Sequence, residues 1–218
     1  IVLVQQSYFP RTDPGQFVIN LKVPTGTRLE DTTAIVAKVE DIVRKVVDKD
    51  DLGVIVSNVG VTPGFSAIYT SNTASHTAFV QASLKAGHRI GSYAYMDRVR
   101  KAIAEQLPEV TTYFQTGGLV DAVLNLGLPA PIDLQVTGSN LDRTYPLATK
   151  LAAEIRALPG VSDVFIPQDD DAPSFMLDID RLHAGEMGLS EKEIVSDVIT
   201  AVNSNQMIAP NYWGDPKS

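Results

Sequence analysis

Residues 16–47, QFVINLKVPTGTRLEDTTAIVAKVEDIVRKVV, change their hydrophobic period halfway along. In the first eight residues apolar side chains occupy every second position, which is typical of a β-strand with one buried face. After this run, valines recur at helical spacing, and Thr27 and Glu30 have the spacing of a capping box at a helix start. A further apolar run, LGVIVSNVG at 52–60, indicates another strand. The stretch therefore predicts a βαβ unit.

The βαβ pattern repeats along the chain. Two more complete units follow, and their helices end in near copies, LPEV at 107–110 and LPGV at 158–161, so the repeat is visible in residues as well as in periodicity. A fourth unit begins with PSFMLDID at 173–180, adds a short helix and enters a longer helix where Ser190 and Glu193 have capping-box spacing, but no closing strand follows. The segments of the second and third units are HTAFVQASLK, SYAYMDRVRKAIAEQL, VTTYFQTG, PIDLQVTG, LDRTYPLATKLAAEIRAL and VSDVFIPQ.

Pairs of βαβ units predict the overall fold. Two such units interleave into βαββαβ, the ferredoxin-like arrangement of an antiparallel sheet with both helices on one face. We therefore expect an α+β fold of two ferredoxin-like subdomains, residues 1–120 complete and residues 121–218 lacking the last strand. The final strand normally pairs with the first, so Ile132–Val136 should be left as an open edge. We expect the missing strand later in the parent chain, after an insertion beginning near Trp213, or from another molecule.

Composition excludes several classes of function. The net charge of −8 and the lack of a basic stripe argue against nucleic acid as a partner. The chain contains no cysteine, which excludes a disulfide, a thiolate metal site and a cysteine nucleophile. No phosphate loop, zinc signature or serine, histidine and carboxylate spacing is present, so we expect neither an enzyme nor a cofactor. Since the sequence starts at Ile1 without a signal peptide, we expect it to be an excised piece of a longer protein.

Two segments resemble signatures of a transporter family. YFPRTDPGQFVINLKVPTGTRLEDT at 8–32 resembles the segment that follows a transmembrane helix in resistance-nodulation-division (RND) efflux pumps, and PSFMLDIDRLHAGEMGLSEKEI at 173–194 resembles a second signature of the same pumps, of the acriflavin-resistance or hydrophobe-amphiphile type. The resemblance implies the porter region of the second large periplasmic loop, whose second subdomain is interrupted by a docking insertion. It also implies an inner-membrane homotrimer that works with a periplasmic adaptor and an outer-membrane channel.

The resemblance further implies a substrate and a place for it. Pumps of this type use a proton gradient to expel hydrophobic or amphiphilic compounds, and their proton-carrying residues lie in transmembrane helices. The loop Asn58–His76 corresponds to the switch loop between the access and deep pockets, with Val59, Val61 and Phe65 as lining residues. Phe79 aligns with a phenylalanine of the deep pocket, where apolar burial tolerates many ligand shapes. The residues alone equally allow a mobile loop with scattered apolar side chains and a Phe79 that belongs to the core.

His183 lies close in sequence to Asp178 and Asp180, and this spacing resembles that of a metal or acid/base cluster. Metal sites normally need three or four convergent ligands, and the other two histidines, His76 and His88, belong to different units. We favour a structural corner, in which the strand ends near Asp180 and the serine of the following capping box starts the next helix.

Metal export is disfavoured by the distribution of candidate ligands. The acidic run 168–171 lies in a connection, where solvated charge is expected and a cation site is the less favoured interpretation. Metal-exporting relatives are expected to use methionines in the pocket. Here the four methionines, Met96, Met176, Met187 and Met207, lie in different elements and are expected to serve core or corner packing.

Two rival functions remain open from the sequence. The first is a free-standing tandem ferredoxin-like module that binds a ligand or regulates another protein, which would need a complete second sheet. The second is a small enzyme on the same fold, which would need convergent polar groups in one cleft. We expect the substrate-handling part of a drug-type RND pump instead.

Overall fold

The computed structural model describes residues 12–60, 74–117, 130–171, 173 and 176–203. The chain divides into two compact units. One contains the described residues up to 171, and the other contains residue 173 and residues 176–203.

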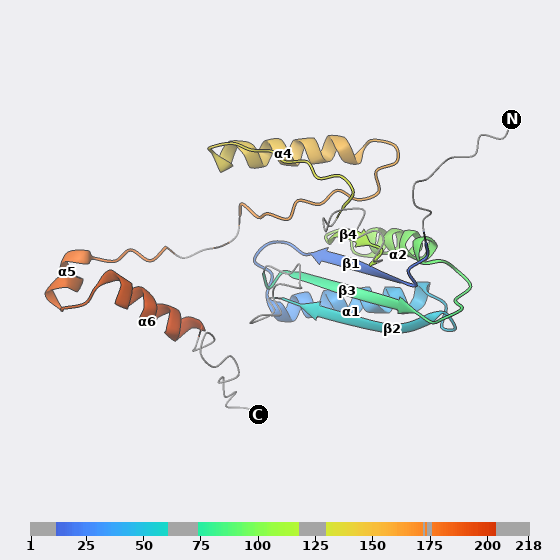
Figure 1. Cartoon of the computed structure of the whole chain (residues 1–218), viewed down its shortest axis with the longest axis horizontal. Coiled ribbons are helices and arrows are strands. Elements are labelled where there is room, and N and C mark those ends of the chain that lie inside the picture. Colours follow the sequence, from blue (N-terminus) through green and yellow to red (C-terminus); the bar gives the residue numbers. More distant parts are fainter. Residues whose placement is uncertain (1–11, 61–73, 118–129, 172, 174–175, 204–218) are drawn as a thin grey trace, which may run out of the picture. The chain divides into compact units, whose positions relative to one another are not determined.

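Four strands form one antiparallel sheet in the order β2-β3-β1-β4 (Figure 1). The central strand β1 pairs with β3 on one side and with β4 on the other, so that Ile19 lies opposite both Val80 and Phe114. The chain order of strands and helices is βαββαβ. The predicted ferredoxin-like first subdomain is therefore confirmed. Its elements are β1 (Gln16–Lys22), α1 (Leu29–Val46), β2 (Leu52–Val59), β3 (Thr77–Leu84), α2 (Ser92–Gln106) and β4 (Thr111–Gln115).

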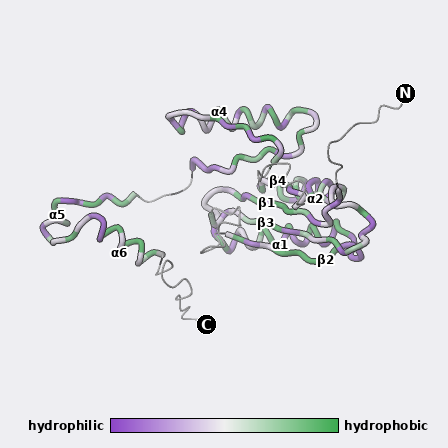
Figure 2. Tube along the Cα trace, in the orientation of Figure 1, coloured by the Kyte–Doolittle hydropathy of each residue, from purple (hydrophilic) through white to green (hydrophobic). Residues whose placement is uncertain are grey.

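Both helices pack on one face of this sheet, and the main core lies between the two layers. Alternate residues of β1 and β3 point at the helices, and Figure 2 shows hydrophobic residues along the strands beside hydrophilic ones. Removing this apolar surface from water is the main favourable contribution to folding. The most deeply buried apolar residues include Phe17, Ile19, Val80, Val39, Val43, Tyr95, Val99 and Ile103.

The predicted capping box at the start of α1 is wrong. The helix starts at Leu29, and its cap residue, Arg28, makes no side-chain cap hydrogen bond. The Thr27 hydroxyl instead donates to the carbonyl of Pro24 at 2.6 Å, which stabilises the preceding turn. A threonine hydroxyl can form several alternative local hydrogen bonds. Here the Thr27 hydroxyl bonds within the turn before the helix and therefore does not cap the helix.

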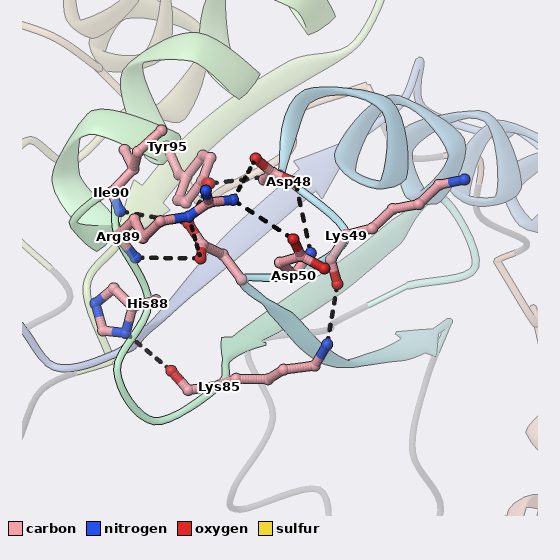
Figure 3. Close-up of polar contacts among 9 residues, drawn as sticks. Asp48, Lys49, Asp50, Lys85, His88, Arg89, Ile90 and Tyr95 are labelled. Carbon is pink, nitrogen blue, oxygen red and sulfur yellow. Dashed lines mark hydrogen bonds and ion pairs between the residues drawn. The ribbon is translucent and has the colours of Figure 1, made fainter.

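A buried carboxylate ties the α1–β2 connection to the start of α2. Asp51 is almost fully buried, and its Oδ2 accepts a hydrogen bond from the Tyr95 hydroxyl at 2.7 Å. The carboxylate also accepts the backbone N–H groups of Arg89 at 3.1 Å and Ile90 at 3.3 Å. Figure 3 shows these three residues gathered beside Asp48, which Arg89 also contacts. The Tyr95 hydrogen bond, more than the opposing effect of burial, holds the pKa of Asp51 below its ordinary value.

The same unit also contains residues 130–171, where only the helix forms as predicted. Helix α4 (Leu141–Arg156) starts after Asn140, whose side-chain oxygen accepts a hydrogen bond from the backbone N–H of Arg143. The strands predicted at 131–138 and 161–168, and the one at 173–180 in the other unit, form no β-ladder among their described residues.

A lack of pairing partners among the described residues explains this difference. Small antiparallel arrangements are marginal until enough strands and a buried face are present, and the described residues contain no strand that pairs with 132–136. Residues 132–136 are unpaired, as predicted, and Ile132 is 80% exposed, but its predicted neighbours are not strands either. The α+β class holds, whereas the subdomain boundaries 1–120 and 121–218 stay a prediction.

The second unit contains α5 (Arg181–Glu186) and α6 (Glu191–Asn203), and both helices have polar caps. The Asp180 carboxylate accepts two backbone N–H groups of the first turn of α5, at 3.0 and 3.1 Å. Before α6, the Ser190 amide donates to Glu193 at 2.8 Å, and the Glu193 amide donates back to the Ser190 hydroxyl at 3.3 Å. The predicted second capping box is confirmed. The segment is a helical corner, and α6 carries both hydrophobic and hydrophilic residues (Figure 2).

We predict that Ile19→Ala strongly destabilises the chain and that Ile132→Ala does not. Ile19 is 0% exposed in the core and Ile132 is 80% exposed. Truncating a buried isoleucine costs about 2–5 kcal/mol through lost burial and the cavity left behind, whereas an exposed site costs less than about 0.5 kcal/mol. Urea unfolding followed by circular dichroism measures both. Equal losses for the two variants would contradict the assignment of the core.

We predict that Tyr95→Phe destabilises the chain more near neutral pH than in acid. The pKa of Asp51 is lowered from an unfolded value of 3.8, so its stabilisation is present above that pH and is lost as the pH falls through the folded pKa. Removing the hydroxyl takes a donor from an ionised, buried acceptor. Urea unfolding at about pH 7 and about pH 3 should therefore show a smaller difference between wild type and variant at the lower pH. The exposed Asp142→Asn variant serves as the control. An equal loss of unfolding free energy in Tyr95→Phe at both pH values would argue against an ionised acceptor.

Candidate functional site

Phe79 lies on the face of the sheet that points away from α1 and α2, which we term the outer sheet face. It is half-buried, whereas its neighbours Ala78 and Val80 point into the core. Phe79 is directly opposite Asn20 on β1 and Asn58 on β2, and cross-strand partners share a face. Phe79 is therefore not a residue of the core beneath the helices. Its role in a pocket stays a prediction.

The other predicted pocket residues do not join Phe79 in the described structure. Val59 lies opposite Ala78, so it points to the helix side of the sheet, where it packs against the core. Val61 and Phe65 lie outside the described residues. Val59 and Phe79 thus occupy opposite faces, and the predicted grouping of these side chains stays untested.

A row of side chains crosses the outer sheet face. Asn20, which faces Phe79 from β1, lies opposite Tyr113 on β4. The Tyr113 ring is in turn contacted by Phe165, with ring centroids 4.4 Å apart and the planes tilted by 35°. The outer sheet face therefore carries aromatic groups on two strands, separated by an amide. Such a surface offers apolar contact area together with hydrogen-bonding groups.

Phe165 belongs to residues 161–169, which we term the strap. The strap follows α4 and lies against β1 and β4. Its last residue, Asp169, forms an ion pair with Lys22 of β1, and its Oδ2 lies 3.0 Å from Nε2 of His76. The prediction that the acidic run is solvated is wrong for this residue, because the Asp169 side chain is only 13% exposed.

The electrostatics of Asp169 follow from these partners. Burial alone would raise the pKa of this carboxyl, but the hydrogen bonds from Lys22 and His76 outweigh burial and lower the pKa below its ordinary value. The carboxylate is thus ionised and already paired with the Lys22 ammonium. Across the described part of the chain, no three histidine, aspartate or glutamate side chains gather as a set of metal ligands.

Sequence reasoning missed a serine, histidine and aspartate that do meet. Asp13 accepts hydrogen bonds from the hydroxyl and the amide of Ser92, and it lies 3.0 Å from Nε2 of His88. Burial would raise the pKa of Asp13, but these hydrogen bonds lower it far below its usual range. A hydrolase triad needs the histidine between the serine and the acid, whereas here the acid lies between them. The trio therefore caps the start of α2 and does not activate a nucleophile. No sequence signal marks it, because the partners are 79 residues apart.

The interpretation of His183 as part of a structural corner is favoured by its surroundings. The side chain is exposed, and it pairs with Glu186 of the same short helix at 3.5 Å. Asp180 is engaged in capping that helix.

The expectation that all four methionines serve packing is wrong for two of them. Met96 is buried in the core, as expected, but Met176 is 95% exposed and Met187 is also exposed, so neither serves packing in this structure. Met207 lies outside the described residues.

None of the described helices is both long enough and apolar enough to cross a membrane. This finding concerns only the residues that the structure describes.

Comparison with known proteins connects this fold to a family. The model of the AcrB/AcrD/AcrF family matches residues 1–209. The nickel and cobalt resistance protein CnrA of Cupriavidus metallidurans is 32% identical over 76 residues, which are 35% of this chain and 7% of that protein. The nickel-cobalt-cadmium resistance protein NccA of Alcaligenes xylosoxydans xylosoxydans is 32% identical over 89 residues, which are 41% of this chain and 8% of that protein.

Solved structures show the same fold. Two crystal forms of a heavy metal efflux pump superimpose with TM-scores of 0.66 and 0.65 at 20% and 21% identity. They cover 87% and 86% of this chain and 19% of those chains, so the chain corresponds to about a fifth of the length of the solved pump. At this level of identity the likeness concerns the fold alone. Since the family model matches almost the entire sequence, the chain belongs to the AcrB/AcrD/AcrF family of resistance-nodulation-division (RND) transporters.

Proposed function

We propose that the chain is the porter region of the second large periplasmic loop of a proton-driven RND efflux transporter in the inner membrane. The observation that carries this proposal is the family match over residues 1–209. The βαββαβ sheet and the fold shared with a solved pump support it.

The mechanism that follows is alternating access. Rigid subdomains of the porter region tilt against each other and thereby open and close a cleft to substrate. Proton energy enters elsewhere in the parent protein. That protein acts as a homotrimer with a periplasmic adaptor and an outer-membrane channel.

Hydrophobic or amphiphilic compounds are the substrate class that the outer sheet face supports best. Phe79 supplies an apolar surface there, and Val54 and Val56 on the neighbouring strand are exposed on the same face. Apolar contact is non-directional, so such a surface accepts substrates of varied shape. Asn20 and Asn58 flank Phe79 and add amide groups that can orient a polar end of the substrate.

Divalent transition metal ions are the second candidate substrate. Two relatives at 32% identity are named for resistance to nickel and cobalt, and one of them also for cadmium. A net charge of −8 would favour the approach of cations.

We predict that Phe79→Ala lowers export of amphiphilic compounds by the full-length transporter that contains this chain. Burying a phenyl ring stabilises by about 1.5–3 kcal/mol, so binding should weaken by about tenfold or more. The measurement is growth inhibition by a cationic dye and a detergent in a host without its own pumps, at equal transporter abundance. The matched variant Phe79→Leu keeps an apolar side chain and should retain most of the resistance.

The same strains tested with nickel and cobalt salts separate the two substrate classes. Resistance to dye and detergent that depends on Phe79 supports amphiphile export. Resistance to the metal salts alone, unchanged by Phe79→Ala, supports the second candidate. A full-length transporter that protects against none of these compounds would contradict both substrate proposals.

A further inference from the structure

One end of the first sheet gathers several connections of the chain. The carbonyl of Asp51, in the connection after α1, accepts a hydrogen bond from the backbone N–H of Lys85, which follows β3, at 2.8 Å. Asp13, just before β1, accepts a hydrogen bond from the backbone N–H of Ser92, the first residue of α2, at 3.1 Å. The end of α1, the start of α2 and the start of β1 therefore meet. We term this the entry end, because the chain enters the sheet there.

A shallow concavity lies at the entry end, between the last turn of α1 and the first turns of α2. Its volume is about 460 Å³. The charged side chains that line it are four basic groups and one acid, namely Arg44, Lys45, Lys49, Arg98 and Asp48. The concavity is thus locally positive, in a chain whose net charge is −8.

The acidic groups around the concavity already have basic partners. Asp48 accepts a hydrogen bond from Nη2 of Arg89 at 3.1 Å. Two acids of α1, Glu40 and Asp41, both pair with Arg44, at 2.6 and 3.2 Å. These pairs use the charge of Arg44 and Arg89. The acids are therefore not available to the remaining cations of the concavity.

Three cations of the concavity stay available to a ligand. Lys45, Lys49 and Arg98 are exposed, and within the described part of the chain no ion pair holds any of them. The Arg98 guanidinium lies 5.8 Å from the centre of the Tyr95 ring, a cation–π contact that keeps it at the rim. Figure 3 shows the Lys49 ammonium pointing away from the other side chains drawn. Three positive charges thus face solvent around one concavity.

The floor of the concavity is apolar. Val46 and Ile90 are half-buried there, and the Tyr95 ring is fully buried. A cationic rim above an apolar floor suits an anion that carries an apolar part, because the charges hold the anionic group while the floor removes apolar surface from water. A phospholipid headgroup has both parts, a phosphate and the glycerol esters next to it. Free phosphate has nothing to offer the floor.

We propose that the entry end rests on the membrane surface and binds anionic phospholipid headgroups through Lys45, Lys49 and Arg98. The proposal rests on the porter function proposed above, because in a periplasmic loop of an inner-membrane transporter the chain reaches β1 from a membrane-spanning segment, which turns the entry end towards the bilayer. The contact anchors the first subdomain on the lipid surface. It uses no residue of the outer sheet face.

Vesicle flotation of the whole 218-residue chain tests the headgroup site. One set of vesicles contains phosphatidylglycerol and phosphatidylcholine in equal amounts, and the other contains phosphatidylcholine alone. Each basic group at an anionic surface strengthens binding by about fivefold, so the chain should prefer the first set by on the order of a hundredfold. Raising the salt from about 0.1 M to about 1 M shortens the screening length from about 10 Å to about 3 Å and should release the chain. Millimolar inorganic phosphate at constant ionic strength should not.

Two triple variants of equal net charge separate a site from the charge of the whole chain. The first removes the cations of the concavity and should lose most of the preference for anionic vesicles: Lys45→Gln, Lys49→Gln and Arg98→Gln. The matched control removes exposed lysines elsewhere and should keep the preference: Lys38→Gln, Lys150→Gln and Lys192→Gln. Circular dichroism of both variants reports whether the chain remains folded.

The full-length transporter tests the same contact in its own membrane. A fluorescent label at Lys49→Cys, in a background without other cysteines, should be quenched by phospholipids that carry a nitroxide on the headgroup. The matched label is at Lys38→Cys, about two helical turns before Lys45 on α1 and thus further from the entry end. It should be quenched much less. Dye export by the unmodified transporter is the separate readout of the porter function.

Each result bears on the proposal. The expected result is a preference for anionic vesicles that only the first triple variant loses, together with quenching at position 49. Equal binding to both sets of vesicles, equal loss in both triple variants or release by inorganic phosphate each overturns the headgroup site. A transporter that exports dye without quenching at position 49 overturns the membrane contact and leaves the porter function standing. A transporter that exports nothing overturns the porter function, and the vesicle assay then decides the headgroup site by itself.

Discussion

Burial of one face of a four-stranded sheet under two helices is the constraint on which the rest of the described structure depends. Because side chains alternate along a strand, fixing Ile19 and Val80 in the core also fixes Asn20 and Phe79 on the opposite face. A slip of one residue would bury Phe79 under the helices and expose Val80, at the cost of the whole apolar layer. The outer sheet face is thus not assembled separately. Its composition follows from the register that the core imposes.

The second half of the chain shows what happens without that constraint. Its helices form, because capping and helical spacing act locally, as in the box of Ser190 and Glu193. Its predicted strands do not pair, because a strand needs partners and a covered face that the described residues do not supply. Residues 161–168 have a strand-like pattern, yet the strap uses its charged and aromatic side chains on the first sheet instead. The sequence pattern therefore indicates which secondary structure a segment can form. Whether a predicted strand forms depends on the pairing partners that are available to it.

The sequence predicted most of the first subdomain, because alternation and helical spacing are strong and local signals. It failed where one side chain has competing partners or where the partners are distant. Thr27 bonds to the preceding turn and not to the helix, and both choices fit its spacing. The bond between Asp51 and Tyr95 spans 44 residues, and the contact between His76 and Asp169 spans 93. An acidic run looks solvated unless its basic partners can be located, and only the fold brings Lys22 and His76 to Asp169.

This unit is held together by two kinds of contact. The core contacts are numerous, non-directional and lost together, so the sheet and its two helices behave as one rigid body. The strap depends on a few charged hydrogen bonds, each worth about 1.5–3 kcal/mol, and such energies can be overcome one at a time. Removing a single partner of a buried ion pair is costly, whereas separating both into water is not, because each is then hydrated. The strap is attached through such paired charges and one aromatic contact, without a β-ladder.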